Sequence, residues 1–164
     1  MYSEILLKVK TEEEREALIE EIRGLKASLY EHGSFFEDTL RTRVRDWVSQ
    51  VIKDAVAQRD AVAQKEIDKE KYLQGLIEEL SKLKSAKLVL AFEPTEAAVQ
   101  RYHEFISKEV GEGVVLNISC LPGILGGAII IFEGKYRDFS LRRVFEEEFR
   151  QSRELILKTL SLNA

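Results

Sequence analysis

Residues 122–149, PGILGGAIIIFEGKYRDFSLRRVFEEEF, carry four structural signals in succession. A glycine-rich loop leads into the aliphatic run Ala128–Phe132, which is typical of a buried strand. Glu133-Gly134 predicts a tight hairpin turn, so Lys135–Asp138 is expected to return as a short strand. Ser140 then begins an amphipathic helix. This stretch predicts two strands of a small sheet followed by a C-terminal helix.

The residues immediately upstream add a strand, a helix and a second strand. Residues 87–92 are expected to form the first strand, and Thr95 is expected to cap a helix that ends at Gly111. Val114–Cys120 is the next strand. The order β-α-β-β-β-α predicts a small mixed sheet with helices packed on it.

Residues 1–86 have a different composition, with no proline, three glycines and a dense mixture of Glu, Lys, Arg, Ala and Leu. Such a composition favours helices. We therefore predict an α+β protein with an N-terminal all-helical region at 1–86 and a small α/β domain with a long C-terminal helix at 87–164. The boundary is placed near residue 86, where the composition changes.

We expect three or four helices in the first region. Thr11 and Glu14 have the spacing of a capping box, and an apolar stripe follows at three- and four-residue steps. His32-Gly33-Ser34 should end this helix, and one helix or a pair should then run from about Phe35 to Leu83. The stripes fit either an ordinary intramolecular bundle or faces reserved for partner helices, because periodicity alone does not separate the two.

Composition excludes several function classes. The net charge of −4 argues against a nucleic-acid partner, which normally requires a basic surplus. Cys120 is the single cysteine, so neither an intramolecular disulfide nor a cysteine metal site can form. The longest apolar stretch, residues 121–132, is shorter than the roughly 18 residues of a membrane-spanning helix.

No residue pattern predicts catalysis, a cofactor or a metal. His32 and His103 have no further ligand at suitable spacing. The glycine cluster at 123–127 lacks the Lys-Ser/Thr ending of a phosphate-binding loop and precedes a strand. We interpret these glycines as the site of a close backbone approach, and we expect no enzymatic activity.

The segment from Pro122 to Phe145 resembles the C-terminal signature of the delta subunit of F-type ATP synthases, the oligomycin-sensitivity-conferring protein family. That signature runs Asp-Pro-x-Leu-x-Gly-Gly, an aliphatic strand, a glycine hairpin, and Asp-Gly-Ser before a Leu-rich helix. Leu121 and Phe139 depart from the family's acid and glycine. The residues that carry the structural motif here are Pro122, Gly126, Gly127, Gly134, Asp138 and Ser140.

The resemblance implies a non-catalytic peripheral-stalk (stator) subunit that links the catalytic head of a rotary proton-translocating ATP synthase to its stalk. It implies alpha-type N-terminal helices of the head and a b-type stalk subunit as partners. Membrane association is expected only through the complex, which places the protein in the cytoplasm at the inner face of the cell membrane. Neither a cofactor nor a nucleic acid is expected.

Two sets of apolar residues are candidates for binding these partners. For a head-subunit helix they are Phe36, Leu40, Val44, Trp47, Val48 and Val51. Trp47 is the best single anchor. The alternative is that Trp47 fills the core of the helical region. The C-terminal helix is expected to meet the sheet and a stalk helix through Val144, Phe145, Phe149, Leu155, Ile156 and Leu160.

Alternatives remain open for the short helical region. It could be a stalk-like arm, as in the E-type stalk protein of vacuolar and archaeal ATPases or the flagellar and type III export stator protein. Other interpretations are a stand-alone helical regulator or chaperone that binds client helices, and a small-molecule-binding domain that uses the glycine loop. The ungapped match at residues 135–142 favours the delta family.

Overall fold

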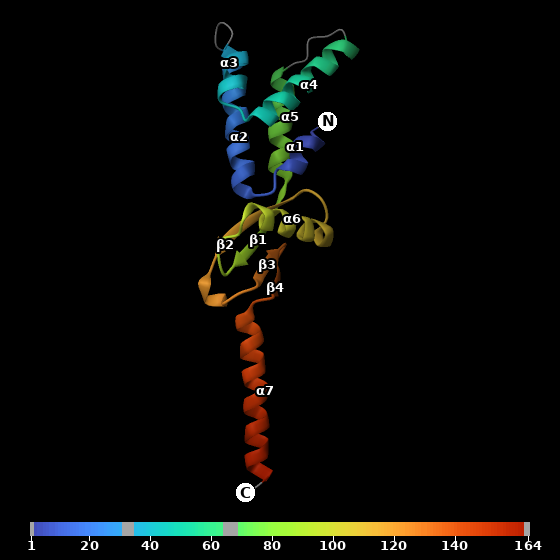
Figure 1. The fold of residues 1–164 in the computed structure, drawn as a ribbon. Coiled ribbons are helices and arrows are strands. Elements are labelled where there is room, and N and C mark those ends of the chain that lie inside the picture. The colour runs from blue at the N-terminus through green and yellow to red at the C-terminus, as the bar shows by residue number, and fades with distance from the viewer. Residues whose placement is uncertain (1, 31–34, 64–68, 163–164) are drawn as a thin grey trace. The chain divides into compact units, whose positions relative to one another are not determined.

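The computed structural model describes residues 2–30, 35–63 and 69–162, and the side chains of 56–68 and 155–164 lie outside this description. It confirms the predicted α+β class (Figure 1). The chain divides into two compact units. Met1–Lys84 and His103–Val115 form the helical unit, and Ser85–Tyr102 and Leu116–Ala164 form the sheet unit. The predicted division at residue 86 stays a prediction.

The described residues of the N-terminal segment 1–84 form five α-helices, where three or four were expected. A single 3₁₀ turn, η1, follows the second of them. The elements are α1 (Ser3–Lys8), α2 (Glu12–Ala27), η1 (Ser28–Tyr30), α3 (Phe35–Thr42), α4 (Asp46–Ala63) and α5 (Lys69–Lys82). The turn predicted at His32-Gly33-Ser34 lies outside the described residues.

Helix α2 begins with the predicted capping box. The Thr11 hydroxyl oxygen accepts a hydrogen bond from the Glu14 backbone amide at 3.1 Å, and the Glu14 carboxylate accepts one from the Thr11 amide at 3.2 Å. Two amides that the helix itself leaves unpaired are thereby satisfied. The start of α2 is therefore encoded locally.

The prediction of one helix or a pair between Phe35 and Leu83 was wrong, because the chain also breaks between α3 and α4. Arg45 lies in this break and donates hydrogen bonds to Glu21 of α2, at 2.6 Å from Nε and 3.2 Å from its backbone amide. The partners are 24 residues apart. A tertiary ion pair satisfies the amide at the break, and sequence periodicity does not reveal such a contact.

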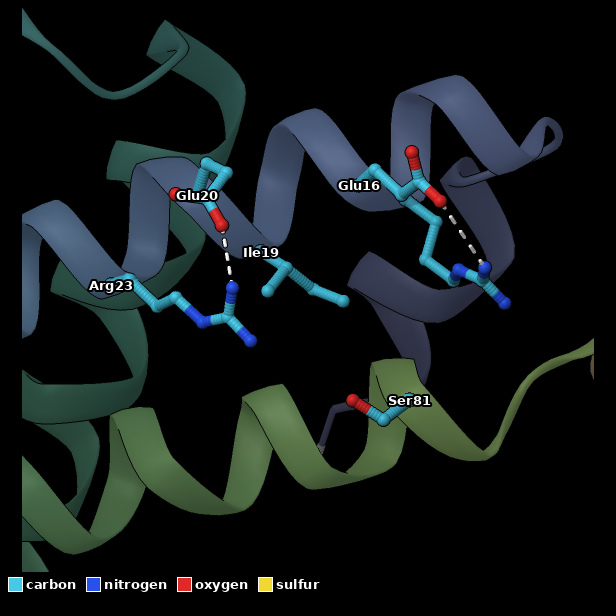
Figure 2. Close-up of a pocket in the computed structure, with 6 residues that line it drawn as sticks. Glu16, Ile19, Glu20, Arg23 and Ser81 are labelled. Carbon is cyan, nitrogen blue, oxygen red and sulfur yellow. Dashed lines mark hydrogen bonds and ion pairs between the residues drawn. The ribbon is translucent and has the colours of Figure 1, made fainter.

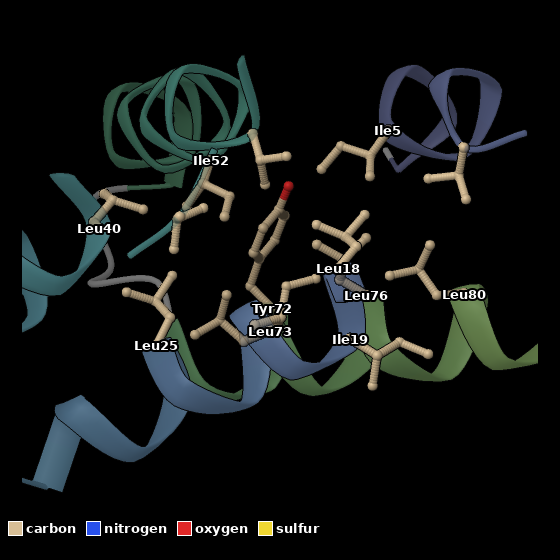
Figure 3. Packing of buried hydrophobic residues seen from close by; sticks show 14 of the residues in the cluster. Ile5, Leu18, Ile19, Leu25, Leu40, Ile52, Tyr72, Leu73, Leu76 and Leu80 are labelled. Carbon is tan, nitrogen blue, oxygen red and sulfur yellow. The ribbon is translucent and has the colours of Figure 1, made fainter. Parts of the chain in front are cut away.

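The core of the helical unit is formed by the apolar faces of its helices (Figure 3). Helix α5 contributes Leu73, Leu76 and Leu80, each no more than 1% exposed. Tyr2 anchors the N-terminal end of the chain, since its hydroxyl donates to the Tyr72 carbonyl at 3.2 Å. Gly75 leaves the space that Tyr2 occupies, because a Cβ there would lie 2.6 Å from the tyrosine hydroxyl.

The second half of the chain has the predicted order β-α-β-β-β-α. Its elements are β1 (Lys84–Leu90), α6 (Glu96–Val110), β2 (Val114–Cys120), a 3₁₀ turn η2 (Pro122–Ile124), β3 (Ala128–Phe132), β4 (Lys135–Asp138) and α7 (Leu141–Leu162). The four strands form one sheet in the order β2-β1-β3-β4. Strand β3 pairs antiparallel with both β1 and β4.

Two predicted chain reversals are confirmed by their backbone angles. Gly111, which follows α6, has a φ of +101°, a conformation that glycine adopts without strain. In the hairpin between β3 and β4, Glu133 and Gly134 have φ values of +47° and +76°. Positive φ at both central residues is the mark of a type I′ turn, whose twist suits a two-residue hairpin.

Candidate docking surfaces

In the sheet unit, the glycine pair and the start of α7 approach each other closely. Gly127 has a φ of +78°, and a Cβ added there would lie against the Phe139 carbonyl oxygen and 3.1 Å from the Ser140 Cα. A Cβ on Gly126 would lie 2.8 Å from the Leu141 side chain. The glycines therefore permit backbone contact, which confirms the structural interpretation of this cluster.

Hydrogen bonds secure this contact on both sides of the junction. The Leu141 amide donates to the Gly126 carbonyl at 2.9 Å, and the Phe139 amide donates to the Ala128 carbonyl at 2.8 Å. The first residue of α7 is thus bonded to the loop before β3. We call this arrangement, residues 126–128 with 138–143, the α7 junction.

Asp138 and Ser140 cap α7, as predicted. The buried Ser140 hydroxyl accepts from the Arg143 amide at 3.3 Å, and the Asp138 carboxylate accepts from the Ser140 amide at 2.8 Å. Tyr136 donates a second hydrogen bond to the Asp138 carboxylate at 3.2 Å. These bonds, those from Ser140 foremost, lower the pKa of Asp138 below its usual value.

We expect this carboxylate to make the α7 junction sensitive to acid. Because the folded-state pKa is depressed, its stabilising effect is present above the unfolded pKa of about 3.9 and is lost as the pH falls through the folded value. Asp138→Asn should therefore lose less stability than the wild type between about pH 5 and pH 2. Urea denaturation across this range measures the difference. If the stability of the two proteins fell equally with decreasing pH, Asp138 would not be the source of the acid sensitivity.

Helix α7 presents an apolar stripe that the described structure leaves exposed. The exposed fractions are 46% for Leu141, 52% for Val144, 50% for Phe145 and 72% for Phe149. We expected this stripe to meet the sheet in part, but these side chains are not covered by it. Leu155, Ile156 and Leu160 also belong to α7, and their side chains lie outside the description.

Apolar side chains around the α7 junction are exposed as well, and sequence reasoning missed them. Leu121, Leu125 and Phe139 are 50%, 65% and 56% exposed. None of the three was among the candidate binding residues. Only departures from the family signature, at Leu121 and Phe139, pointed to anything unusual there.

In the helical unit, the six residues expected to bind a head helix fall into two groups. Leu40, Val44 and Val48 are at most 5% exposed and belong to the core. Phe36, Trp47 and Val51 are partly buried against that core and retain accessible surface. Docking through the six residues stays a prediction. Only Phe36, Trp47 and Val51 offer accessible surface to a partner.

Lysines lie over both aromatic rings of that group. The Lys8 ammonium is 5.0 Å from the centre of the Trp47 ring, and the Lys69 ammonium is 4.7 Å from that of Phe36. Cation–π contacts at exposed sites are worth only about 0.5–1 kcal/mol. A partner could displace the lysines at small cost, so they do not close the surface.

A pocket of about 470 Å³ lies between α2 and α5 in the helical unit (Figure 2). Its charged side chains are already paired: Arg23 with Glu20 at 2.5 Å, and Arg15 with Glu12 at 2.8 Å. The lining residues are Arg15, Glu16, Ile19, Glu20, Arg23 and Ser81. Such compensated charges form no evident catalytic constellation.

Within the described ranges, no group of three or more His, Cys, Asp or Glu side chains could hold a metal ion. In the same part of the chain, no helix is both long and apolar enough to cross a membrane.

Comparison with known proteins identifies what the chain is similar to. Residues 6–147 match the family described as ATP synthase delta (OSCP) subunit. None of the curated protein sequences is significantly similar to the chain. A chain in the cryoEM structure of the Polytomella F-ATP synthase, primary rotary state 3, is 22% identical and has a TM-score of 0.41. The alignment covers 47% of the present chain and 99% of the Polytomella chain.

Proposed function

Because the chain belongs to the ATP synthase delta (OSCP) subunit family, we propose that its two units bind different subunits of one complex. The protein is a non-catalytic subunit of the peripheral stalk, the stator of an F-type ATP synthase. It therefore acts by holding other subunits in place. We further propose that its partners are an alpha-type head subunit and a b-type stalk subunit, and that the complex holds it at the inner face of the cell membrane.

A b-type stalk helix packs along α7 in this proposal. The observation that carries it is the exposed stripe of Leu141, Val144, Phe145 and Phe149 on a helix whose first turn is fixed at the α7 junction. Apolar residues spaced three and four apart are the usual anchors for an amphipathic partner helix. A fixed start suits a stator, because a flexible one would yield to torque before transmitting it.

An alpha-type N-terminal helix of the head packs on the helical unit. Phe36, Trp47 and Val51 would supply the contact surface, while Leu40, Val44 and Val48 support them from the core. Tryptophan is among the residues that most often dominate binding energy at interfaces. Trp47 is therefore the anchor in this unit.

Trp47→Asp tests the head contact. We expect head-subunit binding to weaken by about tenfold or more, since an interface tryptophan typically contributes at least about 1.4 kcal/mol. Binding to the isolated head can be measured by surface plasmon resonance, with circular dichroism as the check on folding. Leu7→Asp is the matched control, because Leu7 lies in the same unit and is 66% exposed.

The result separates docking from core filling. Loss of head binding with an unchanged melting temperature supports docking. Loss of the fold in the Trp47 variant alone assigns Trp47 to the core instead. Equal head binding by the variant and the wild type would contradict the proposed contact.

A further inference from the structure

The apolar surface of α7 continues onto the loop before β3. Leu141 contacts this loop through its hydrogen bond to Gly126, and Leu125 precedes that glycine. Leu125 has a φ of +64°, a conformation that leucine adopts only at an energetic cost, yet its side chain is 65% exposed. Burial of the Leu125 side chain does not compensate this backbone strain, whereas contact with another molecule would compensate it.

The apolar positions of α7 recur at both 7- and 11-residue intervals. Phe149 and Ile156 are seven residues apart, and eleven residues separate Val144 from Leu155, Phe145 from Ile156, and Phe149 from Leu160. At about 100° per residue, each interval returns to within about 20° of the same direction, so these positions share one side of the helix. A single helix can therefore follow α7 over its length of about 33 Å.

One acidic residue interrupts this stripe. At about 100° per residue, Glu148 projects between the directions of Leu141 and Val144. The adjacent acids are paired, Glu146 with Arg142 at 2.8 Å and Glu147 with Arg150 at 3.8 Å. Glu148 forms no ion pair with any of the described side chains. A helix that covered the stripe would place this carboxylate in the seam.

We propose that the surface formed by Leu125 and the α7 stripe receives one amphipathic helix that carries a lysine or arginine in its own apolar stripe, opposite Glu148. This inference rests on the proposed binding of a stalk helix and specifies the chemistry of that helix. A charged residue in an otherwise apolar seam fixes the register of a helix pair. Fixed register would suit a connector that must not slide.

A second copy of this chain fits the surface poorly. Parallel pairing would place Glu148 opposite its own counterpart, so two carboxylates would repel each other. Antiparallel pairing about the centre of α7 would place it opposite Leu155, leaving a covered carboxylate without a partner. A basic residue from a different subunit satisfies the carboxylate in both orientations.

The test measures binding of the full chain to the stalk subunits purified from the same ATP synthase. Glu148→Lys should weaken binding at least tenfold, in line with the coupling of close charge pairs at interfaces. Glu154→Lys is the matched control, since it makes the same charge change on the opposite face of α7 and should alter binding less than threefold. Replacing the facing basic residue of the stalk helix by Glu should restore binding to Glu148→Lys.

Leu125→Gly provides a second, independent readout. It should keep or raise the melting temperature, because glycine removes the strain at positive φ, while stalk binding falls at least threefold. Unchanged binding of this variant would remove Leu125 from the surface.

The outcomes distinguish this inference from the function on which it rests. If the wild type does not bind the stalk subunits, the proposed stalk contact fails. If the wild type binds and Glu148→Lys binds equally well, the proposed basic partner residue is wrong. A wild-type dimer in analytical ultracentrifugation that Phe149→Asp dissociates would identify a second copy as the occupant and overturn the inference.

Discussion

Gly127→Ala should destabilise the sheet unit by about 3 kcal/mol. Part of this effect comes from the backbone, because a φ of +78° costs a residue with a Cβ roughly 1–2 kcal/mol. The remainder comes from the collision of that Cβ with the Phe139 carbonyl, since overpacking typically costs about 1–3 kcal/mol. The obstacle is backbone at the start of α7, which cannot move away as a flexible side chain would.

Gly134→Ala is the matched control for this prediction. Gly134 has nearly the same φ, +76°, but nothing lies within 4 Å of the added Cβ. Its effect should therefore be limited to about 1–2 kcal/mol of backbone strain. Urea denaturation of both variants measures the difference. Equal destabilisation would show that the close contact between residue 127 and Phe139 adds no steric cost.

Phe149→Asp should reduce binding to the stalk subunits at least thirtyfold while leaving the fold intact. Truncating a central interface aromatic typically costs about 2–4 kcal/mol, and the introduced carboxylate adds a desolvation penalty. Since Phe149 is 72% exposed, its removal deprives the free protein of little packing. Isothermal titration calorimetry with the stalk subunits measures the effect.

Phe92→Asp is the corresponding control, because Phe92 is in the same unit and is 66% exposed but is not part of α7. It should bind as the wild type does. A comparable loss of affinity in both variants would indicate a general effect of the added charge. Retained affinity in Phe149→Asp would remove this residue from the interface.

The sheet unit was predictable because its decisive signals are local. The Glu133-Gly134 turn and the Ser140 cap each act within a few residues, so the sequence displays them directly. The sequence does not show that Gly127 contacts Phe139, or how closely. It does indicate that these glycines have a structural role, because the loop precedes a strand and lacks the features of a phosphate-binding loop.

The helical unit was less predictable because long-range contacts decide it. The break between α3 and α4 depends on Glu21 and Arg45, which lie on different segments. Likewise, the docking of Tyr2 against Gly75 joins the two ends of this unit's main segment. Neither pair disturbs the apolar period of its own helix, so a helix pattern alone cannot reveal it.

Apolar spacing identified the candidate docking residues but not how each would be used. A stripe at three- and four-residue steps looks the same whether the chain's own core or another protein covers it. Val48 is fully buried, whereas Val144 is 52% exposed, and their sequence patterns are alike. Which residues remain for partners depends on how many neighbouring helices the same chain provides.

Native mass spectrometry of the chain mixed with separately purified head and stalk subunits tests most directly whether this protein connects them. We predict a ternary assembly with the wild type, loss of the head alone with Trp47→Asp, and loss of the stalk alone with Phe149→Asp. A wild-type chain that binds only one of the two partners, or variants that each lose both while still folded, would contradict this role.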